Sequence, residues 1–459
     1  MTAPSIVWLR RDLRLADQPA LHAAAQEGPV VCVYVLDDET PRHRKMCGAS
    51  RWWLHHSLAS LSRSLEVRGS RLILRRGRCE DELASVAAEV GAGRVHCIRH
   101  YEPWWRNAER AVAQKLDLIC HDGNYLMPAG AVVTGSGQPY KIYTPFSRAL
   151  LDAFHPSAPL SAPDLPAPDA WPRSDRLEDW QLLPTKPDWA TGFVEAWDVG
   201  EEAAADRLDW WDGKVSAYAT GRNLPSRDLS SRLSPHLHFG EISPLQVWQA
   251  LEQRQGEGAD VFRKELIWRD YAQTVICQSP DYGQKSHRGE FEHLEWRDPD
   301  TDEAARADFA AWQQGRTGYP IVDAGMRQLW RTGWMHNRVR MIAASFLVKH
   351  LLIDWRHGER WFWDTLVDAD YGSNAVNWQW TAGSGVDSNM FVRIMAPLTQ
   401  SAKFDAAGYI REWVPELASL PDEEIHDPAP LRRRGYAPMI VGHKEGRERA
   451  LAAYRAAKA

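Results

Sequence analysis

Residues 30–36 read VVCVYVL, an uninterrupted apolar run rich in valine. Comparable short runs lie at residues 6–10, 71–77, 94–100 and 116–122. The segments between them, such as SRWWLHHSLASLSRSLEV (50–67), carry apolar residues at helical spacing. Because apolar runs of this length are typical of strands covered on both faces, their alternation with helices predicts a doubly wound parallel α/β sheet. Neither G-x-G-x-x-G nor G-x-x-x-x-G-K-[ST] follows these runs, so the common nucleotide signatures are missing.

The composition predicts a globular, soluble, cytoplasmic protein of two domains. The chain has 459 residues, a hydrophobic content of 44% and no apolar segment long enough to span a membrane. Its six cysteines include no C-x-x-C pair, so we expect neither a disulfide framework nor a metal site. A net charge of −6 means that any contact with nucleic acid has to use a local basic patch. We expect a monomer.

The domain organisation follows from a change in sequence pattern: the strand-like runs end before residue 130, and a proline-rich segment and then helical periodicity follow. Eight prolines lie between residues 156 and 187, a density that suits an extended connector. Beyond it, segments such as VFRKELIWRDYAQTVIC (261–277) and NRVRMIAASFLVKHLLI (337–353) have helical periodicity. We therefore expect an α/β domain over residues 1–130, a connector over 131–195 and an all-α domain over 196–459.

Two predicted helices carry polar side chains on one face. Glu265, Trp268 and Arg269 fall at i, i+3 and i+4, a pattern that an exposed ion pair beside a core tryptophan would also give. Asn337, Arg340 and Met341 repeat the same spacing in the later helix. An asparagine inside a helix suggests that its side chain has a hydrogen-bonding role. The acids of DADYGSNAVNWQW (368–380) are candidate partners for Arg340.

The segment GRNLPSRDLSSRLSPHLHFGEISP (221–244) mixes serines with arginines before a predicted helix. Hydroxyls, backbone N–H groups and guanidinium groups together suit a pyrophosphate, although a simple capped helix has the same composition.

Taken together, the motifs resemble those of the photolyase/cryptochrome flavoproteins. The resemblance rests on segment 221–244, KELIWRDY (264–271), GRTGYPIVDAGMRQLWRTGWMHNRVRM (315–341), DWRHGERWF (354–362) and segment 368–380, in this order. It extends from WLRRDLRL (8–15) to IVGHKEGRERALAAY (440–454), so it covers essentially the whole chain. The resemblance implies an N-terminal α/β domain and a helical domain that binds FAD.

The resemblance also implies roles for individual residues. The FAD-binding positions are Tyr218, Ser230, Ser231, Leu233, Ser234, Arg269, Arg340, Asp368, Asp370 and Asn374. Asn374 corresponds to the residue that faces flavin N5. The positions of the substrate pocket and the DNA contact are Arg222, Glu265, Trp268, Asn337, Arg338, Met341, Trp380, Gln400 and Lys403. Among all these, Glu265, Asn337, Met341 and Asn374 are the expected catalytic residues. Trp296, Trp355 and Trp378 match a chain that passes electrons to oxidised flavin, and core packing is the alternative for Trp296.

The expected activity is light-driven repair of cyclobutane pyrimidine dimers in ultraviolet-damaged DNA. Relatives that act on the 6-4 photoproduct carry histidines where this chain has Asn337-Arg338 and Met341. The sequence ends soon after residue 454, which argues against the alternative of a signalling cryptochrome with a long tail. A flavin electron-transfer protein that does not bind DNA is a further alternative.

Two segments depart from the family pattern. Residues 388–397, SNMFVRIMAP, differ from the common run at a DNA-facing loop, and Trp104-Trp105 in YEPWWRNAER (101–110) replace a folate-binding Asn-Glu pair. The antenna chromophore is therefore left open between a differently bound methenyltetrahydrofolate, a deazaflavin and none.

Overall fold

A computed structural model describes residues 3–252, 254–388, 391, 393–429 and 435–457. These residues form two compact units, and each unit is described by itself. Unit 1 comprises Met1–Trp189, Trp197–Val215 and Ser231–Pro280, and unit 2 comprises Ala190–Ala196, Ser216–Ser230 and Asp281–Ala459. Both units are discontinuous in sequence. The predicted domain boundaries stay a prediction, because units of this kind need not coincide with folding domains.

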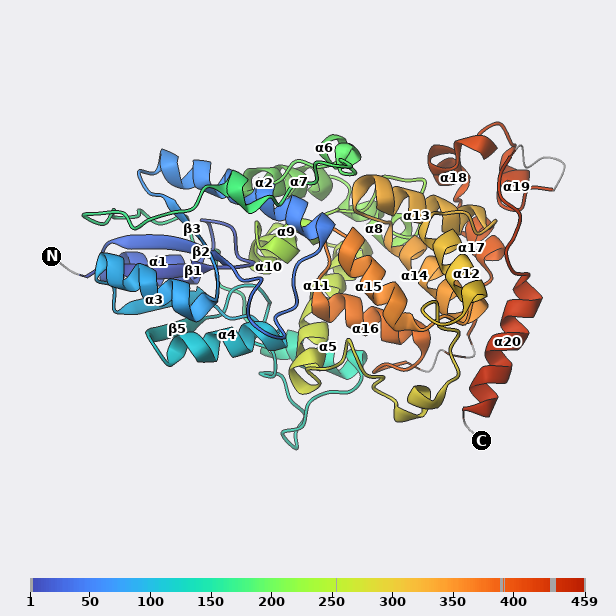
Figure 1. The fold of residues 1–459 in the computed structure, drawn as a ribbon, viewed down its shortest axis with the longest axis horizontal. Coiled ribbons are helices and arrows are strands. Elements are labelled where there is room, and N and C mark those ends of the chain that lie inside the picture. Colours follow the sequence, from blue (N-terminus) through green and yellow to red (C-terminus); the bar gives the residue numbers. More distant parts are fainter. Residues whose placement is uncertain (1–2, 253, 389–390, 392, 430–434, 458–459) are drawn as a thin grey trace. The chain divides into compact units, whose positions relative to one another are not determined.

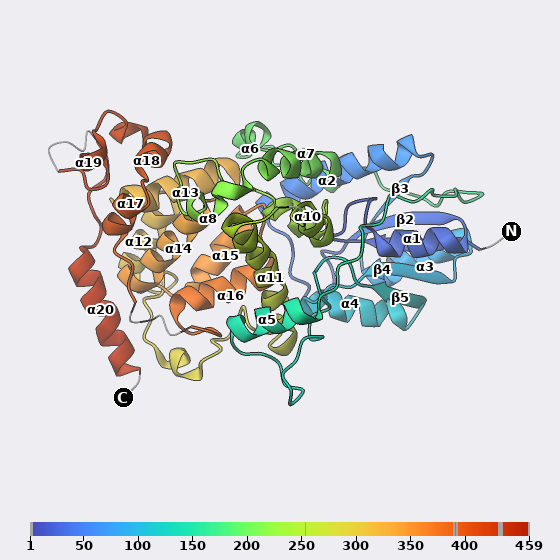
Figure 2. The ribbon, with the colours of Figure 1, turned by 180° about the vertical axis from the view of Figure 1, so that it is seen from behind.

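The core of unit 1 is a parallel sheet with the strand order β3-β2-β1-β4-β5. The strands are β1 (Ser5–Leu9), β2 (Val30–Leu36), β3 (Leu72–Arg76), β4 (Arg94–Ile98) and β5 (Asp117–His121). The central strands β1 and β2 are buried along their whole length and pair in the register Val7↔Cys32. This confirms the predicted doubly wound sheet. Figure 1 shows its strands side by side among helices α1–α4, and Figure 2 shows them from behind.

The helices of unit 1 follow the expected periodicity. They are α1 (Pro19–Glu27), α2 (Gly48–Val67), α3 (Cys79–Val90), α4 (Pro103–Ala113), α5 (Tyr143–Ala153), α7 (Glu201–Asp212), α9 (Ser234–Phe239), α10 (Pro244–Ala250) and α11 (Glu257–Gln278). In α2, Trp53 is fully buried, and its indole N–H donates to Glu241 at 3.0 Å. This hydrogen bond joins α2 to the segment that follows α9.

Unit 2 is helical, as the periodicity predicts. Its helices are α6 (Thr191–Ala196), α8 (Tyr218–Gly221), α12 (Glu303–Gln313), α13 (Pro320–Thr332), α14 (Asn337–Ser345), α15 (Trp355–Thr365), α16 (Tyr371–Ala382), α17 (Pro397–Lys403), α18 (Ala407–Trp413), α19 (Asp422–Ile425) and α20 (His443–Ala456). In the described part of the chain, no strand of the sheet follows His121. No described helix combines the length and the apolar character needed to cross a membrane.

Local capping explains where the central helices of unit 2 begin and end. Pro320 occupies the first turn of α13, and Gly333 follows its last turn with φ of 68°, the left-handed conformation that glycine adopts at least cost. The predicted helix over 337–353 is shorter in the structure. Helix α14 ends at Ser345 and passes into a π-helical turn over Phe346–His350. Such wide turns are frequent at functional sites.

Candidate functional site

The stretch 368–380 is organised around the start of α16. Asp370 caps this helix, because its carboxylate accepts the N–H of Ser373 at 2.6 Å. Asp368 lies just before the helix and accepts two hydrogen bonds from the Arg340 guanidinium, at 3.0 and 2.8 Å. The Arg340 side chain also donates to the carbonyl of Met335 at 2.7 Å. The ion pair predicted between Arg340 and Asp368 is confirmed, and it joins α14 to the start of α16.

Asn374 is buried and oriented by a residue that the sequence analysis did not identify. Its amide N–H groups donate to the backbone carbonyl of Glu359, at 3.0 Å, and to the Glu359 carboxylate, at 2.9 Å. Both partners are oxygen acceptors, so they fix which end of the amide faces them. The amide oxygen of Asn374 is therefore directed elsewhere. An oxygen acceptor is the chemistry that the N–H at N5 of a reduced flavin requires.

A basic surface in unit 2 brings together several predicted DNA contacts. Arg338 donates to the side-chain oxygen of Asn223 at 2.5 Å and lies 4.5 Å from the ring centroid of Phe404. Lys403 approaches the same ring at 5.4 Å. Burial lowers the pKa of Arg338, and the neighbouring positive charge of Arg222 lowers it further. Mutual repulsion of this kind is relieved when an anion such as a phosphate binds.

The remaining predicted residues of this surface have different degrees of exposure. Asn337 is exposed at the first residue of α14, and Met341 is half-buried one turn later, 3.7 Å from an Arg338 nitrogen. Gln400 and Trp380 are half-buried, on α17 and α16. Part of segment 388–397, which differs from the family pattern, lies outside the described residues. Ser388 is described, and its hydroxyl donates to the carbonyl of Trp380 at 3.0 Å.

The three tryptophans of the predicted electron-transfer chain all lie in unit 2. Trp378 and Trp355 are buried, whereas the half-buried Trp296 packs against a hydrophobic cluster that includes Phe291 and Leu294. The ring contacts of Trp378 among the described residues are with Phe362, at 5.0 Å, and with Trp312, at 6.3 Å. The fully buried Trp312 was not predicted, and only the high tryptophan content of the chain hinted at it.

A glycine in α15 makes room for Trp378. A Cβ atom at Gly358 would lie 2.2 Å from the far edge of the Trp378 indole, which is closer than real atoms approach. The helix α15 can therefore pack against Trp378 only with glycine at this position. This close approach keeps Trp378 in a single place beside Asn374, which lies one turn earlier on α16.

The predicted FAD-binding residues are divided between the units. Unit 2 contains six of them: Tyr218, Ser230, Arg340, Asp368, Asp370 and Asn374. Unit 1 contains the other four: Ser231, Leu233, Ser234 and Arg269. Within unit 1, the Ser231 hydroxyl accepts the N–H of Leu233 at 3.3 Å, directly before α9 begins at Ser234. Arg232 between them has φ of 52°, which is uncommon for a residue with a side chain. Strained backbone of this kind is found more often at functional sites than elsewhere.

Arg269 in α11 joins α9, which follows this turn, to the segment that contains Asn124. Its guanidinium donates to the carbonyls of Leu237, at 3.1 Å, and Asn124, at 3.4 Å. The expected substrate residues Glu265 and Trp268 lie on the same helix and are half-buried. The shared helical face predicted from their spacing is consistent with this continuous helix.

Asp270, next to Arg269, is a buried carboxyl group whose charge should affect stability. Burial raises its pKa to about 7. The hydrogen bond that it accepts from the Met127 N–H, at 2.8 Å, lowers the pKa but does not offset the effect of burial. Its second oxygen has no hydrogen-bond partner among the described residues. In an unfolded chain this carboxyl group has the ordinary aspartate pKa of 3.8, so the folded state binds more protons at intermediate pH.

We therefore predict that stability falls as the pH rises through this window, and that Asp270→Asn removes the effect. Asparagine keeps the acceptor for Met127 but carries no charge. Between pH 5 and 6.5 the wild-type free energy of unfolding should lose about 2 kcal/mol that the variant retains. Urea unfolding of both proteins across this range measures the difference. Parallel pH profiles would contradict the prediction.

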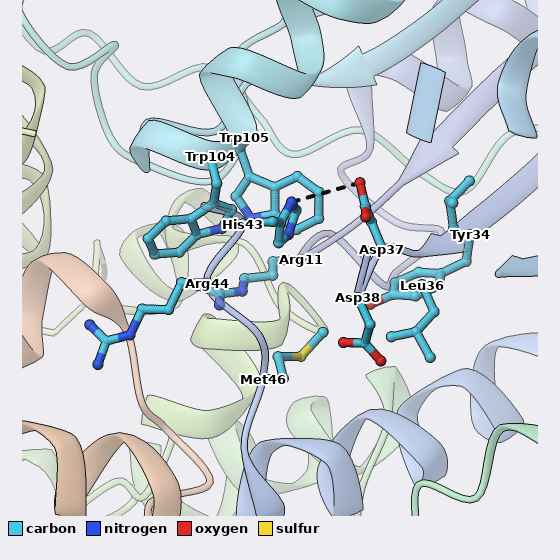
Figure 3. Close-up of a pocket in the computed structure, with 11 residues that line it drawn as sticks. Arg11, Tyr34, Leu36, Asp37, Asp38, His43, Arg44, Met46, Trp104 and Trp105 are labelled. Atoms are coloured by element: carbon cyan, nitrogen blue, oxygen red, sulfur yellow. Dashed lines mark ion pairs between the residues drawn. The ribbon is translucent and has the colours of Figure 1, made fainter. Parts of the chain in front are cut away.

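A second candidate binding site lies at the carboxyl ends of β1 and β2 in unit 1. Figure 3 shows His43, Trp104 and Trp105 together on one side of this pocket and Asp37 and Asp38 on the other. The imidazole of His43 meets the Trp105 ring edge-on, with centroids 4.7 Å apart, and lies 3.8 Å from the Asp37 carboxylate. In open α/β sheets, ligands bind at this edge of the strands. Trp104 and Trp105, which differ from the family pattern, thus line a small pocket with aromatic walls.

In each unit, the predicted residues have the chemistry that part of FAD requires. In unit 1, Ser231 and Arg232 form the turn before α9, and hydroxyls and guanidinium groups suit a diphosphate. In unit 2, the Asn374 amide directs its N–H groups to Glu359, which leaves its oxygen as an acceptor. The Arg340 guanidinium, paired with Asp368, is a charged hydrogen-bond donor near the start of α16, the helix that carries Asn374.

Comparisons with known proteins show which family the chain belongs to. The family model of DNA photolyase matches residues 5–169, and that of the FAD-binding domain of DNA photolyase matches residues 262–456. A deoxyribodipyrimidine photo-lyase of Agrobacterium fabrum is 48% identical, over 100% of this chain and 98% of its own length. Cryptochrome-2 of Arabidopsis thaliana is 36% identical over 94% of this chain and 74% of its own length.

Among solved structures, a bacterial class III photolyase from Agrobacterium tumefaciens superimposes with a TM-score of 0.94 and 46% identity, covering 100% of this chain and 98% of that one. The match extends over both units. The chain therefore belongs to the photolyase/cryptochrome family of flavoproteins and carries its FAD-binding domain.

Proposed function

We propose that the protein repairs cyclobutane pyrimidine dimers in DNA, using light. The observation that carries the proposal is α14, where Asn337, Arg338 and Met341 present an amide, a cation and a thioether, while His336 caps the helix and accepts the N–H of Arg338 at 3.2 Å. The photo-lyase relative, identical at 48% of positions over the full chain, supports the same activity. Bound in its reduced form, FAD would supply an excited-state electron to the dimer and recover it after the ring opens.

The residues of the chain would bind and orient the lesion. A dimer has to leave the base stack before it can approach a cofactor, and the handling of flipped bases is common to enzymes of this kind. Asn337 and Glu265 would hydrogen-bond the pyrimidine edges, while Trp268 and Trp380 would pack on their faces. Arg222, Arg338 and Lys403 would neutralise the phosphates beside the lesion. The Arg340–Asp368 pair would hold the flavin in place.

The decisive experiment measures repair directly. The purified protein with reduced FAD is incubated with an oligonucleotide that contains one thymine dimer, under near-ultraviolet to blue light and in the dark. Restoration of intact thymines in the light alone is the expected result. If dimers persist in the light while a partner's binding changes, the protein is a photoreceptor. If it shows no preference for dimer-containing DNA at all, it is an electron-transfer flavoprotein.

We predict that Trp378→Phe slows the photoreduction of oxidised FAD and leaves repair by chemically reduced protein unchanged. Indole is oxidised more readily than a phenyl ring, and Trp378 is buried on α16 one turn after Asn374. Absorbance of the flavin during blue illumination measures photoreduction. Trp210→Phe is the control, because Trp210 is 38% exposed in unit 1 and serves no predicted transfer. A normal photoreduction rate in the Trp378 variant would show that the electron enters elsewhere.

We propose that an antenna chromophore binds at the pocket in Figure 3. The inference is supported by its aromatic wall, formed by His43, Trp104 and Trp105, and by its place at the carboxyl ends of the strands. Heat release of chromophores followed by absorption spectroscopy distinguishes methenyltetrahydrofolate from a deazaflavin. Loss of a released second chromophore in Trp105→Ala, with FAD retained, would support this location.

A further inference from the structure

Tyr143 stacks face to face on Trp268. Their ring centroids are 3.5 Å apart and their planes differ by 3°. Tyr143 is the first residue of α5, and Trp268 lies in the middle of α11. A flat ring has two faces, and this contact covers one face of the Trp268 indole. Any base that packs on Trp268 has to use the opposite face or the ring edge.

The hydroxyl of Tyr143 adds a second link to the same helix. It donates to the backbone carbonyl of Lys264 at 3.0 Å. In a regular α-helix this carbonyl also accepts the N–H of the residue four positions later, which is Trp268. The residue after Lys264 is Glu265, the expected acceptor for a pyrimidine edge. One side chain therefore contacts both the plane of Trp268 and the helical turn that carries Glu265.

The surroundings of Tyr143 hold its ring in place. Tyr271 meets Tyr143 edge-on at 5.8 Å and meets Trp268 edge-on at 5.7 Å. Phe146, one turn after Tyr143 on α5, packs against Tyr271 at 5.2 Å. Tyr143 itself is only 9% exposed. Edge-to-face and stacked contacts on different sides of a ring leave it one orientation.

We propose that Tyr143 is a positioning residue for lesion recognition, an inference that rests on the proposed repair function. Tyr143 fixes the plane of Trp268 and the turn of Glu265 before DNA arrives. The flipped dimer then meets a preformed surface, and no binding free energy is spent on ordering an indole side chain. Undamaged DNA, whose bases remain stacked, does not reach Trp268. Tyr143 should thus affect the preference for damaged DNA and not the affinity for DNA in general.

The test compares three variants of the full chain with FAD bound and reduced, in the dark. Tyr143→Leu removes the stack and the hydroxyl, and Tyr143→Phe keeps the stack alone. Phe146→Leu is the matched control, because among the described residues its ring contacts are with Tyr140 and Tyr271 and not with Trp268. The measured quantities are the dissociation constants for a thymine-dimer oligonucleotide and for the same oligonucleotide without the dimer.

Tyr143→Leu should weaken dimer binding by about three- to tenfold, the range of an aromatic pair, and leave binding to intact DNA unchanged. Tyr143→Phe should stay within about twofold of the wild type, since its ring preserves the stack. An unchanged preference in Tyr143→Leu, or an equal loss in Phe146→Leu, would overturn the proposal. A wild-type protein that does not repair dimers in light would overturn the repair function itself, and the two failures are separate results.

Discussion

Arg340→Ala is expected to deprive the protein of FAD and to lower its free energy of unfolding by about 3–5 kcal/mol. The substitution leaves the Asp368 carboxylate, whose side chain is 4% exposed, without the guanidinium that now donates two hydrogen bonds to it. A buried charge without its partner is among the most costly defects in a folded protein. The substitution also frees the Met335 carbonyl and detaches α14 from the start of α16. Both changes open the predicted flavin site.

The flavin absorbance of the purified variant, relative to its protein absorbance, measures FAD retention, and urea unfolding measures stability. Arg327→Ala is the matched control. Arg327 also makes two hydrogen bonds to one carboxylate, Glu416, but both side chains are about a quarter exposed (25% and 28%). Solvent screens such a pair, so we expect a loss of at most about 1 kcal/mol and full FAD content. Equal FAD content in the two variants would contradict a flavin-holding role for Arg340.

The parts of this structure that could be predicted from the sequence depend on short-range patterns. The run VVCVYVL becomes β2, because seven consecutive buried positions need apolar side chains on both faces of the sheet. The Arg340–Asp368 pair was also predictable, since a half-buried arginine needs an acid and DADYG supplied one. Asp370 follows the same logic, because an aspartate directly before a helix commonly caps it.

Contacts between distant segments could not be predicted in this way. Glu359 lies in a helix whose sequence, WRHGERWFWDT, contains several charged residues, and nothing local marks this glutamate as the buried one that orients Asn374. Tyr143 and Trp268 are 125 positions apart, and their stacking depends on how α5 packs on α11. The asparagine that accepts from Arg338, Asn223, is likewise separated from it by 115 positions. Sequence periodicity identifies a helical face but not the side chain opposite it.

The orientation of the Asn374 amide yields the second large effect. In Asn374→Asp an oxygen replaces the amide nitrogen that donates to the Glu359 carbonyl and carboxylate. A carboxylate would then face two acceptors, one of them negatively charged, inside a buried site where Glu359 is 2% exposed. We expect the free energy of unfolding to fall by about 3–5 kcal/mol, the usual cost of a buried charge that lacks a partner. Urea unfolding measures the loss, and flavin absorbance reports whether FAD is still bound.

Two further variants test the cause of this loss. Asn377→Asp introduces the same charge on the same helix, but Asn377 is exposed and, among the described residues, its side chain donates to the carbonyl of Ser373 alone, so we expect a loss of about 1 kcal/mol. The double variant Asn374→Asp with Glu359→Gln places an amide donor opposite the new carboxylate. It should regain part of the lost stability, because one hydrogen bond is restored and one negative charge is removed. If the second substitution restores nothing, Glu359 does not hold the Asn374 amide, and the oxygen that we assign to flavin N5 has no fixed direction.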